Sequence, residues 1–566
     1  GRYGVALPNG ESIRLKPASL RPTAHAKVRE TARLMEHAGT IARLPVTVLS
    51  GFLGAGKTTL TENLLLAGGA IRAAGEVAAR GEARRTTSDW MKIERDRGIS
   101  VSASVMTFEF ENLVFNLLDT PGHEDFSEDT YRTLTAADCA VMVLDAAKGI
   151  EPQTLKLFEV CRLRDIPIVT FINKMDREAQ DPIALLDEVQ EKLQLDTAPL
   201  YWPAASGQRF SGMVDLATNE LIQFERRPGE APKIGAAPRI AADESTLQAN
   251  LDESVYGELA EGREMATGLL PEFDKEAFLG GHMTPVVFGS ALRHFGVLEL
   301  LRTLHAYAPP PRDQKAEKKG EPVTIHSGDK LVAGFVFKIQ ANMDPNHRDR
   351  VAFLRLCSGE FKRGMRLKTA GGKQLNIHNP MMFLAQDREI AETAYAGDVI
   401  GVPNHGQLRV GDSLSETGDI KFAGIPNFAP ELLRRARVKD PMKAKHLRKA
   451  LESLAEEGVT QLFKPAIGSD MIVGAVGQLQ FEVMTERVAA EYNLEVVFEP
   501  APYNVARWLS CDDPKVLEAF LDKNKSTSGT DLDDAPVYLA KNAWDVGYAQ
   551  EKNPDIRFTA TKERSL

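Results

Sequence analysis

Residues 51–58, Gly-Phe-Leu-Gly-Ala-Gly-Lys-Thr, have the composition of a loop that binds phosphate groups. They fit the pattern GxxxxGK followed by Ser or Thr, in which glycines let backbone N–H groups turn toward phosphates at the N-terminus of a helix. We expect Lys57 to reach the β- and γ-phosphates of a nucleotide and Thr58 to bind Mg²⁺. The pattern leaves the base open. The residues expected to contact the nucleotide in this loop are Gly51, Gly54, Ala55, Gly56, Lys57, Thr58 and Thr59.

Residues 173–176, Asn-Lys-Met-Asp, predict which base is bound. A carboxylate at Asp176 would accept hydrogen bonds from the N1–H and the exocyclic amine of guanine, and adenine offers no such pair of donors. The tetrapeptide follows an apolar run, and ligands of parallel α/β sheets bind at the carboxyl ends of the strands. We therefore expect guanine. The residues expected around the base are Asn173, Lys174 and Asp176, with Ser290, Ala291 and Leu292 closing the pocket through a backbone amide directed at guanine O6.

Residues 119–123, Asp-Thr-Pro-Gly-His, follow another apolar run and carry groups suited to hydrolysis. Asp119 is placed to bind magnesium, usually through water, and Gly122 can move toward the γ-phosphate. His123 would position the attacking water, a role that glutamine has in Ras-like proteins. The alternative is that His123 is a turn residue on the surface.

Positioning these motifs requires a parallel sheet. From residue 46 to about 308 the chain alternates strand, loop and helix patterns, and helical spacing is clear over 152–164 and 182–193. Continuous apolar runs of this kind are typical of strands buried on both faces of a parallel sheet. The runs are residues 46–50, 113–118, 140–144 and 166–172.

The rest of the chain predicts further domains, because 566 residues exceed what a single core supports. Residues 46–308 would form the nucleotide-binding domain, with an insertion near 207–280. The polar, proline-led stretch 309–320 predicts a linker. Short β-branched strands broken by glycines predict a β-barrel over 321–418, and mixed helices and strands predict an α+β domain over 419–566.

Residues 1–45 differ from the remainder by a basic excess. Alternation around Asn9-Gly10 predicts a β-hairpin, which could be the remnant of a small SH3-like module, and a short helix is expected near 24–38. A transit peptide is the weaker interpretation, because such peptides are poor in acidic residues.

Composition excludes several classes of protein. The hydrophobic content of 43% and the charged content of 26% are ordinary for a globular chain. No apolar run reaches about 18 residues, so we expect no membrane span. A net charge of -10 argues against nonspecific coating of nucleic acid. The four cysteines are scattered without a CxxC pair, which argues against a zinc cluster and for a reducing compartment.

The motifs at 119–123 and 173–176, with a following β-barrel, resemble the translational GTPases. Within that group the chain is similar to the release factor 3 branch, and the similarity covers roughly residues 46–566. The segments that carry it are 79–82 (Ala-Arg-Gly-Glu), 88–104, 122–132 and 474–481 (Gly-Ala-Val-Gly-Gln-Leu-Gln-Phe). The alternative for 79–104 is a solvated charged helix.

The resemblance implies an α/β P-loop GTPase domain followed by an elongation-factor β-barrel and an α+β third domain that faces the ribosome. It implies GTP hydrolysis to GDP and phosphate, linked to dissociation of class I release factors from the ribosome after termination. The cofactors would be GTP or GDP and Mg²⁺. The partners would be ribosomal RNA and proteins and class I release factors, and the protein would be a cytoplasmic monomer without membrane contact.

The resemblance also implies roles for individual residues. His123 and Lys57 would be catalytic. The hydroxyl of Ser100, in the first switch segment, would bind Mg²⁺ together with Thr58 and Asp119. Hydrophobic residues would form a gate around His123, namely Leu53 and Ile99.

The phosphate-binding loop departs from the family pattern. Translation factors usually carry His-x-Asp where this chain has Phe52 and Gly54. Residues 44–59 resemble instead the P-loop of metal-chaperone GTPases of the cobalamin-biosynthesis type, which is the alternative assignment. The Cys-x-Cys-Cys metal motif expected of that family is absent from the sequence. A third possibility is a nucleotide-gated ribosome-binding module with weak hydrolysis.

The segment 432–449 carries eight Arg or Lys residues against Asp440 as its single acidic residue. Such a segment can bind the phosphates of ribosomal RNA. A solvated helix face explains it equally well, so both interpretations stay open.

Overall fold

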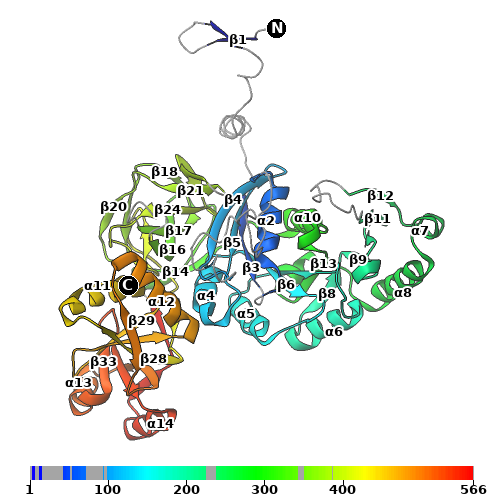
Figure 1. Ribbon diagram of the computed structural model, residues 1–566. Helices are drawn as coiled ribbons and strands as arrows, with labels where there is room; N and C mark the ends of the chain where they lie inside the picture. Colours follow the sequence, from blue (N-terminus) through cyan, green and yellow to red (C-terminus); the bar gives the residue numbers. More distant parts are fainter. Residues whose placement is uncertain are drawn as a thin grey trace.

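Figure 1 shows the computed structural model of the chain, which describes residues 3–6, 12–15, 43–50, 54–71, 94, 99–224, 237–341, 350–384 and 387–564. Three parts follow each other along the chain: a first domain built on a parallel sheet, a β-barrel, and a third domain at the lower left of the view. The N-terminal hairpin is confirmed, because β1 (Tyr3–Ala6) pairs antiparallel with β2 (Ser12–Leu15). The helix expected near 24–38 lies outside the described residues.

The sheet of the first domain confirms the predicted parallel strands. Its strands lie in the order β4-β5-β3-β6-β7-β13-β8, and β4 alone of these runs antiparallel to its neighbour. Every residue of β6, β7 and β13 is buried, which explains why these strands are apolar throughout. The bounds are β3 Arg43–Ser50, β4 Ser104–Phe110, β5 Leu113–Asp119, β6 Cys139–Asp145, β7 Ile168–Asn173, β8 Asp196–Pro199 and β13 Met283–Phe288.

Helices cover both faces of this sheet (Figure 1). Neighbouring strand residues belong to different cores, since Val141 packs with α2 and α10 whereas Met142 packs with α4 and α5. The predicted helices at 152–164 and 182–193 are present as α5 and α6. The bounds are α2 Lys57–Ala67, α4 Ser127–Thr135, α5 Pro152–Leu163, α6 Pro182–Leu193 and α10 Val297–Tyr307.

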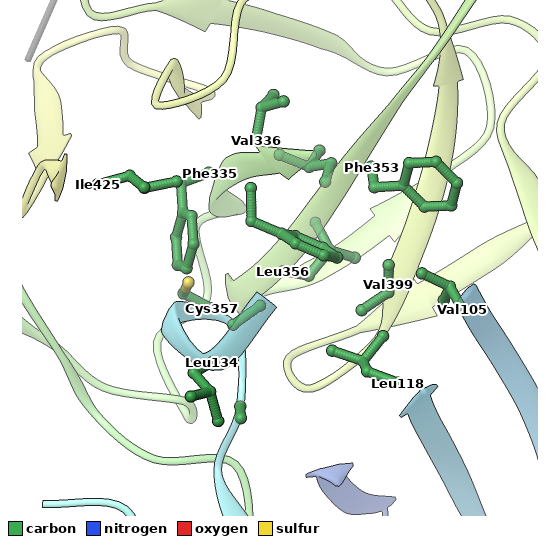
Figure 2. Close-up of a cluster of buried hydrophobic side chains, with 14 of the residues drawn as sticks. Val105, Leu118, Leu134, Phe335, Val336, Phe353, Leu356, Cys357, Val399 and Ile425 are labelled. Carbon is green, nitrogen blue, oxygen red and sulfur yellow. The ribbon is translucent and has the colours of Figure 1, made fainter. Parts of the chain in front are cut away.

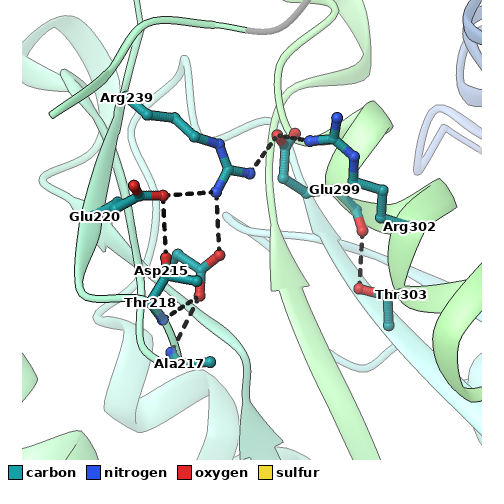
Figure 3. Close-up of polar contacts among 8 residues, drawn as sticks. All are labelled: Asp215, Ala217, Thr218, Glu220, Arg239, Glu299, Arg302 and Thr303. Carbon is teal, nitrogen blue, oxygen red and sulfur yellow. Dashed lines mark hydrogen bonds and ion pairs between the residues drawn. The ribbon is translucent and has the colours of Figure 1, made fainter.

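A second, four-stranded sheet interrupts the first domain and begins at Tyr201, earlier than the insertion expected near 207. Arg239 attaches it to α10, because its guanidinium lies 3.4 Å from Asp215, 3.2 Å from Glu220 and 3.7 Å from Glu299 (Figure 3). The bounds are β9 Tyr201–Ala204, β10 Gly212–Asp215, β11 Glu220–Gln223, β12 Arg239–Ala241, α7 Glu244–Asn250, α8 Glu253–Leu269 and α9 Lys275–Leu279.

The barrel and the first domain share one hydrophobic core. Phe335, Phe353 and Val399 of the barrel pack in the same cluster as Leu118 and Leu134 of the first domain (Figure 2). The long strands are β16 Ala333–Ala341, β17 Arg350–Ser358 and β24 Val399–Pro403, and the short ones are β18 Glu360–Lys362, β19 Arg366–Thr369, β20 Gln374–Asn376, β21 Met381–Leu384, β22 Asp387–Ile390, β23 Thr393–Tyr395 and β25 Ser413–Ser415.

The linker expected over 309–320 is wrong in its second half. Residues Gln314–Lys318 form β14, which pairs with β15 (Glu321–Ile325) on one side and β26 (Ile420–Phe422) on the other. The sequence signal is faint because only Ala316 of this strand is buried. Backbone pairing with a strand about a hundred residues later decides the structure here, and side-chain polarity does not prevent it.

The third domain contains an eight-stranded sheet in the order β31-β28-β30-β29-β33-β34-β32-β35. Segment 432–449 is therefore strand β28, a short 3₁₀ turn and the start of α11, so its interpretation as one helix face is wrong. The described residues contain no helix long and apolar enough to cross a membrane. The bounds are β27 Ile425–Phe428, β28 Leu432–Val438, α11 Ala444–Glu456, β29 Gln461–Pro465, β30 Met471–Ala475, α12 Gln478–Tyr492, β31 Val496–Pro500, β32 Val505–Cys511, α13 Pro514–Lys523, β33 Ser528–Thr530, β34 Pro536–Ala540, α14 Ala543–Lys552, β35 Ile556–Thr559 and β36 Thr561–Arg564.

Candidate nucleotide-binding site

A cavity of about 460 Å³ lies at the carboxyl ends of the parallel strands. Segments that are far apart in sequence meet there because parallel strands all end at the same edge of the sheet. Gly51, Phe52 and Leu53 lie outside the described residues. The sequence-predicted residues that line the cavity are Gly54, Gly56, Lys57, Thr58, Thr59, Ile99, Ser100, Gly122, Asn173, Lys174, Asp176, Ala291 and Leu292.

The phosphate-binding loop has the backbone geometry that only glycine adopts readily. Gly54 has φ +90° and Gly56 has φ +92°, both in the left-handed region. A Cβ at Gly56 would also lie 2.5 Å from Nδ2 of Asn173, so a side chain is excluded there. Helix α2 begins directly afterwards at Lys57, which directs its first backbone N–H groups into the cavity.

Lys57 is buried at the N-terminus of α2, close enough to Asp119 for the two charges to interact. Burial lowers the pKa of Lys57 to about 8, and the nearby Asp119 carboxylate opposes that effect. A phosphate group at this place would add negative charge beside the buried ammonium. The pair is therefore suited to bind phosphate beside a cation.

Asn173 holds the two loops of the cavity together. Its Nδ2 donates to the carbonyl of Ala55 at 2.7 Å, and its Oδ1 accepts from the amide of Ala291 at 2.8 Å. Lys174, at φ +73°, donates from Nζ to the Gly54 carbonyl and to Oδ2 of Asp145, each at 2.6 Å. These contacts join the phosphate loop to the base side of the cavity and fix the distance between them.

Asp176 is oriented by its own neighbours. The hydroxyl of Ser290 donates to Oδ1 of Asp176 at 2.6 Å, and Nε of Arg293 lies 3.8 Å from Oδ2. Ser290 itself is fully buried and supports the cavity from behind. The amide of Ser290 donates to the carbonyl of Phe295, and the amide of Ala291 donates to Oδ1 of Asn173.

Three side chains near the phosphate-binding loop carry oxygen atoms that could bind a cation, namely those of Thr58, Ser100 and Asp119. Oγ1 of Thr58 and Oγ of Ser100 lie 3.3 Å apart, although the chain between them is long. Asp119 is buried close enough to Lys57 to influence its pKa. Hydroxyl and carboxylate oxygens are the ligands that Mg²⁺ prefers, so this donor set fits that ion.

His123 stands apart from the cavity. It precedes the short 3₁₀ helix η2 (Glu124–Phe126), and its ring packs against Phe126 at a centroid distance of 6.1 Å. Its Nδ1 accepts a hydrogen bond from the amide of Asp125 at 3.2 Å and lies 3.3 Å from Oδ1 of the same residue. Gly122 lines the cavity but His123 does not. The structure thus places the ring of His123, the predicted water-positioning group, beside the site, where it contacts Asp125 and does not line the cavity.

Two residues of the site were missed from the sequence. Asp145 ends β6 and pairs with Lys174, and Arg177 lines the cavity next to Asp176. Asp145 carried a usable signal, since it directly follows an apolar run that was itself predicted as a strand. Arg177 lies in an ordinary polar stretch, so no signal in the sequence indicated that it belongs to the site.

Comparison with known proteins covers most of the chain. Residues 43–310 match the family described as "Elongation factor Tu GTP binding domain", residues 331–417 match "Elongation factor G domain 2", and residues 422–550 match "Class II release factor RF3, C-terminal domain". A crystal structure from Thermus thermophilus superposes with a TM-score of 0.65 at 25% identity, covering 83% of this chain and 71% of that one.

A curated relative shares more of its sequence with this chain. Peptide chain release factor 3 of Nitrosomonas europaea is 48% identical over 520 residues, which span 90% of this chain and 95% of that protein. The nucleotide cavity and the long barrel strands lie within the residues that the family models match, and so does most of the third domain. The protein binds guanine nucleotide, hydrolyses GTP and acts with the ribosome in translation. The chain belongs to the peptide chain release factor 3 family of translational GTPases.

Proposed function

We propose that GTP hydrolysis by this chain promotes the dissociation of class I release factors from the ribosome after termination, in the cytoplasm and as a monomer. The observation that carries the proposal is that both segments flanking the γ-phosphate side of the cavity are held by the other two domains. A change at the nucleotide would therefore reach surfaces far from it.

The barrel holds the segment that follows Ser100. Nζ of Lys338, on β16, donates to Oγ of Ser102 at 2.6 Å and to the carbonyl of Ala103. The same ammonium lies 3.4 Å from Oδ2 of Asp129 on α4. A rearrangement of this segment would break the hydrogen bonds that it accepts from the buried ammonium of the barrel.

The third domain holds the segment that follows His123. Nη2 of Arg132, on α4, donates to the carbonyl of Gly458 at 2.6 Å, and Nε2 of Gln461 donates to Oε1 of Glu128 at 2.8 Å. Order and disorder of such segments around the γ-phosphate is how GTPases transmit their nucleotide state.

Within this proposal the site residues have the following roles. Asp176 recognises guanine, Lys57 binds the β- and γ-phosphates, and Thr58 and Ser100 bind Mg²⁺ directly while Asp119 does so through water. His123 positions the attacking water once it turns toward the cavity, which requires movement of the segment that carries it.

The test combines ribosome-stimulated GTP turnover with release of a labelled class I factor from a termination complex. His123→Ala should lower turnover by about two to four orders of magnitude, the scale of a lost water-positioning group, with GTP affinity within a few-fold of the unmodified protein. Each molecule of the variant should then release at most one class I factor, because it cannot complete a second cycle of hydrolysis. A variant that hydrolyses GTP normally contradicts the role of His123.

Gly54 gives one specific reason to keep a second candidate, a nucleotide-gated ribosome-binding module with weak hydrolysis. The position has no side-chain oxygen to offer near the phosphates. Factor release at normal rate without multiple turnovers would support that module.

A further inference from the structure

The start of helix α12 in the third domain contacts the segment that carries His123. The backbone amide of Leu479 donates to Oδ2 of Asp125 at 2.7 Å. Leu479 is in the first turn of α12, where backbone N–H groups have no partner inside the helix. Gly477 precedes the helix and has no side chain to serve as a cap, and a Cβ at Gly477 would collide with the Asp125 carboxylate. A carboxylate from the first domain therefore caps a helix of the third domain.

The same residue also contacts His123, through its backbone amide. Oδ1 of Asp125 lies 3.3 Å from Nδ1 of His123, and the amide of Asp125 donates to the same ring nitrogen at 3.2 Å. Asp125 is buried, with 8% of its surface exposed. Asp125 thus contacts His123 with its backbone amide and the third domain with its carboxylate.

Apolar packing strengthens the contact. Val483, one turn further along α12, forms a buried cluster with Val101 and Phe126. Val101 directly follows the predicted magnesium ligand Ser100, and Phe126 directly follows Asp125. Helix α12 therefore rests on both segments that border the γ-phosphate side of the cavity, and it contacts them with a buried aliphatic side chain.

We propose that Asp125 is a positioning residue through which docked helix α12 keeps the His123 ring turned away from the nucleotide cavity. The inference rests on the proposed role of His123 in hydrolysis. With α12 docked, turning His123 toward the cavity would take Asp125 along and leave the amide of Leu479 without its acceptor, which costs free energy. When α12 moves away, Asp125 loses its second partner and His123 is released.

The docked third domain is then a brake on hydrolysis in the absence of the ribosome. Coupling of this kind is reciprocal in free energy. A nucleotide state that draws His123 into the cavity must weaken the docking of α12 by the same amount. When Asp125 contacts α12, the third domain is docked and His123 is held out of the cavity. When that contact is broken, His123 can turn toward the nucleotide.

The experiment uses Gly477→Ala in the full chain, with Gly547→Ala as its matched control. At Gly477 the backbone has φ -143°, which alanine adopts without strain, so the substitution acts through the collision with Asp125. At Gly547, on α14 of the same domain, a Cβ meets nothing within 4 Å. Ribosome-free GTP turnover should rise about five- to tenfold in Gly477→Ala, the low end of typical coupling between sites. The control should match the unmodified protein.

Two further variants separate the outcomes. Adding His123→Ala to Gly477→Ala should abolish the increase, because the increase acts through that ring. Val483→Ala trims the same interface without touching Asp125 and should also raise turnover, which decides the question if Gly477→Ala fails to fold. Unchanged or slower turnover in a folded variant overturns the inference. If His123→Ala alone hydrolyses GTP normally, the proposed role of His123 fails instead.

Discussion

The hydroxyl of Ser290 lies 2.6 Å from Oδ1 of Asp176, although 114 residues separate them in the chain. Ser290 follows β13 and Asp176 follows β7, and these two strands are parallel neighbours in the sheet. The loops after them therefore meet at one edge. Because the serine hydroxyl occupies one carboxylate oxygen and fixes its plane, Asp176 presents its remaining acceptor capacity to the cavity in one orientation.

Asp176→Asn should weaken GTP binding by several kcal/mol, because acceptors matched to guanine are replaced by a donor that stays unpaired. Binding of xanthosine triphosphate should be partly restored, since its 2-oxo group accepts from an amide. Equilibrium binding measurements with GTP and with xanthosine triphosphate would show this change in base preference. Ser290→Ala serves as the control, with a smaller loss for GTP and no gain for xanthosine triphosphate. Unchanged GTP affinity in Asp176→Asn would remove Asp176 from the pocket.

The basic segment 432–449 should contribute to ribosome binding through its exposed helical part. Arg434 lies 5.9 Å from the ring centroid of Phe481 and Arg435 lies 3.4 Å from Asp470, so both serve the fold. A charge reversal that includes these two arginines would change the stability of the fold as well as ribosome binding, so the two effects could not be separated. The informative variant changes the exposed residues Lys443, Lys445 and Lys449 to glutamate.

That triple variant should bind ribosomes more weakly and lower the slope of log affinity against log salt by up to about three, one unit for each lost phosphate contact. Binding titrations at several salt concentrations give the slope. A matched variant that reverses Lys318, Lys319 and Lys330, exposed on the barrel, controls for net charge. If the two variants behave alike, the segment is only a solvated surface.

Gly54 should make hydrolysis insensitive to the monovalent cation. The family resemblance implies an aspartate at this position that helps to hold such a cation near the phosphates. A Cβ at Gly54 would meet no atom within 4 Å, but φ +90° strains any side chain there. We expect normal GTP affinity, slow ribosome-stimulated turnover and equal rates in potassium and lithium buffers.

Gly54→Asp should restore part of the potassium stimulation, at a cost to the loop of about 1–3 kcal/mol from backbone strain. Gly54→Ala carries the same strain without the carboxylate, so it isolates the cation effect. Turnover of all three proteins in the two buffers is the measurement. Strong potassium dependence of the unmodified chain would show that backbone carbonyls and phosphate oxygens suffice to hold the cation.

The ion pair of the buried Lys338 and the partly buried Asp129 should stabilise the docking of the barrel. Burial lowers the pKa of Lys338, and Asp129 opposes the effect. Burial acts to raise the pKa of Asp129, but Lys338, Arg132 and the amide of Ala103 together bring it below its usual value of 3.8. Asp129→Asn leaves the ammonium buried without its counter-charge and should destabilise the protein by about 3–5 kcal/mol.

The sign of the pH dependence follows from the lowered pKa of Asp129. Its contribution is fully present above the unfolded value near 3.8 and is lost as the pH falls through the lower folded value. Urea unfolding at pH 7 and at pH 5 should therefore show the same deficit for Asp129→Asn, and the deficit should shrink only below about pH 4. Lys338→Met with Asp129→Asn should recover part of the loss. A deficit that vanishes already at pH 5 contradicts this account.

The sequence alone determined the parallel sheet and most of the nucleotide cavity. A buried strand needs an unbroken apolar run, and a loop after it that carries Gly54, Lys57 or Asp176 stands at the ligand-binding edge of a parallel sheet. Each of these motifs is short and local, and the sheet brings the motifs together without further information. Most residues that line the cavity were therefore readable from motif spacing, whereas Ile99 and Ser100 were implied only by the family resemblance and Arg177 was missed.

Only the tertiary structure decided the contacts between distant parts of the chain. The pairing of β14 with β26, the contact of Lys338 with the segment after Ser100, and the cap that Asp125 gives to α12 all join residues far apart in the sequence. Periodicity reports which face of an element is buried but not which element covers it. His123 illustrates the difference, since its motif indicates chemistry at the γ-phosphate, whereas Asp125 and α12 set where its ring lies. That position depends on how whole domains dock, and no local pattern in the sequence records it.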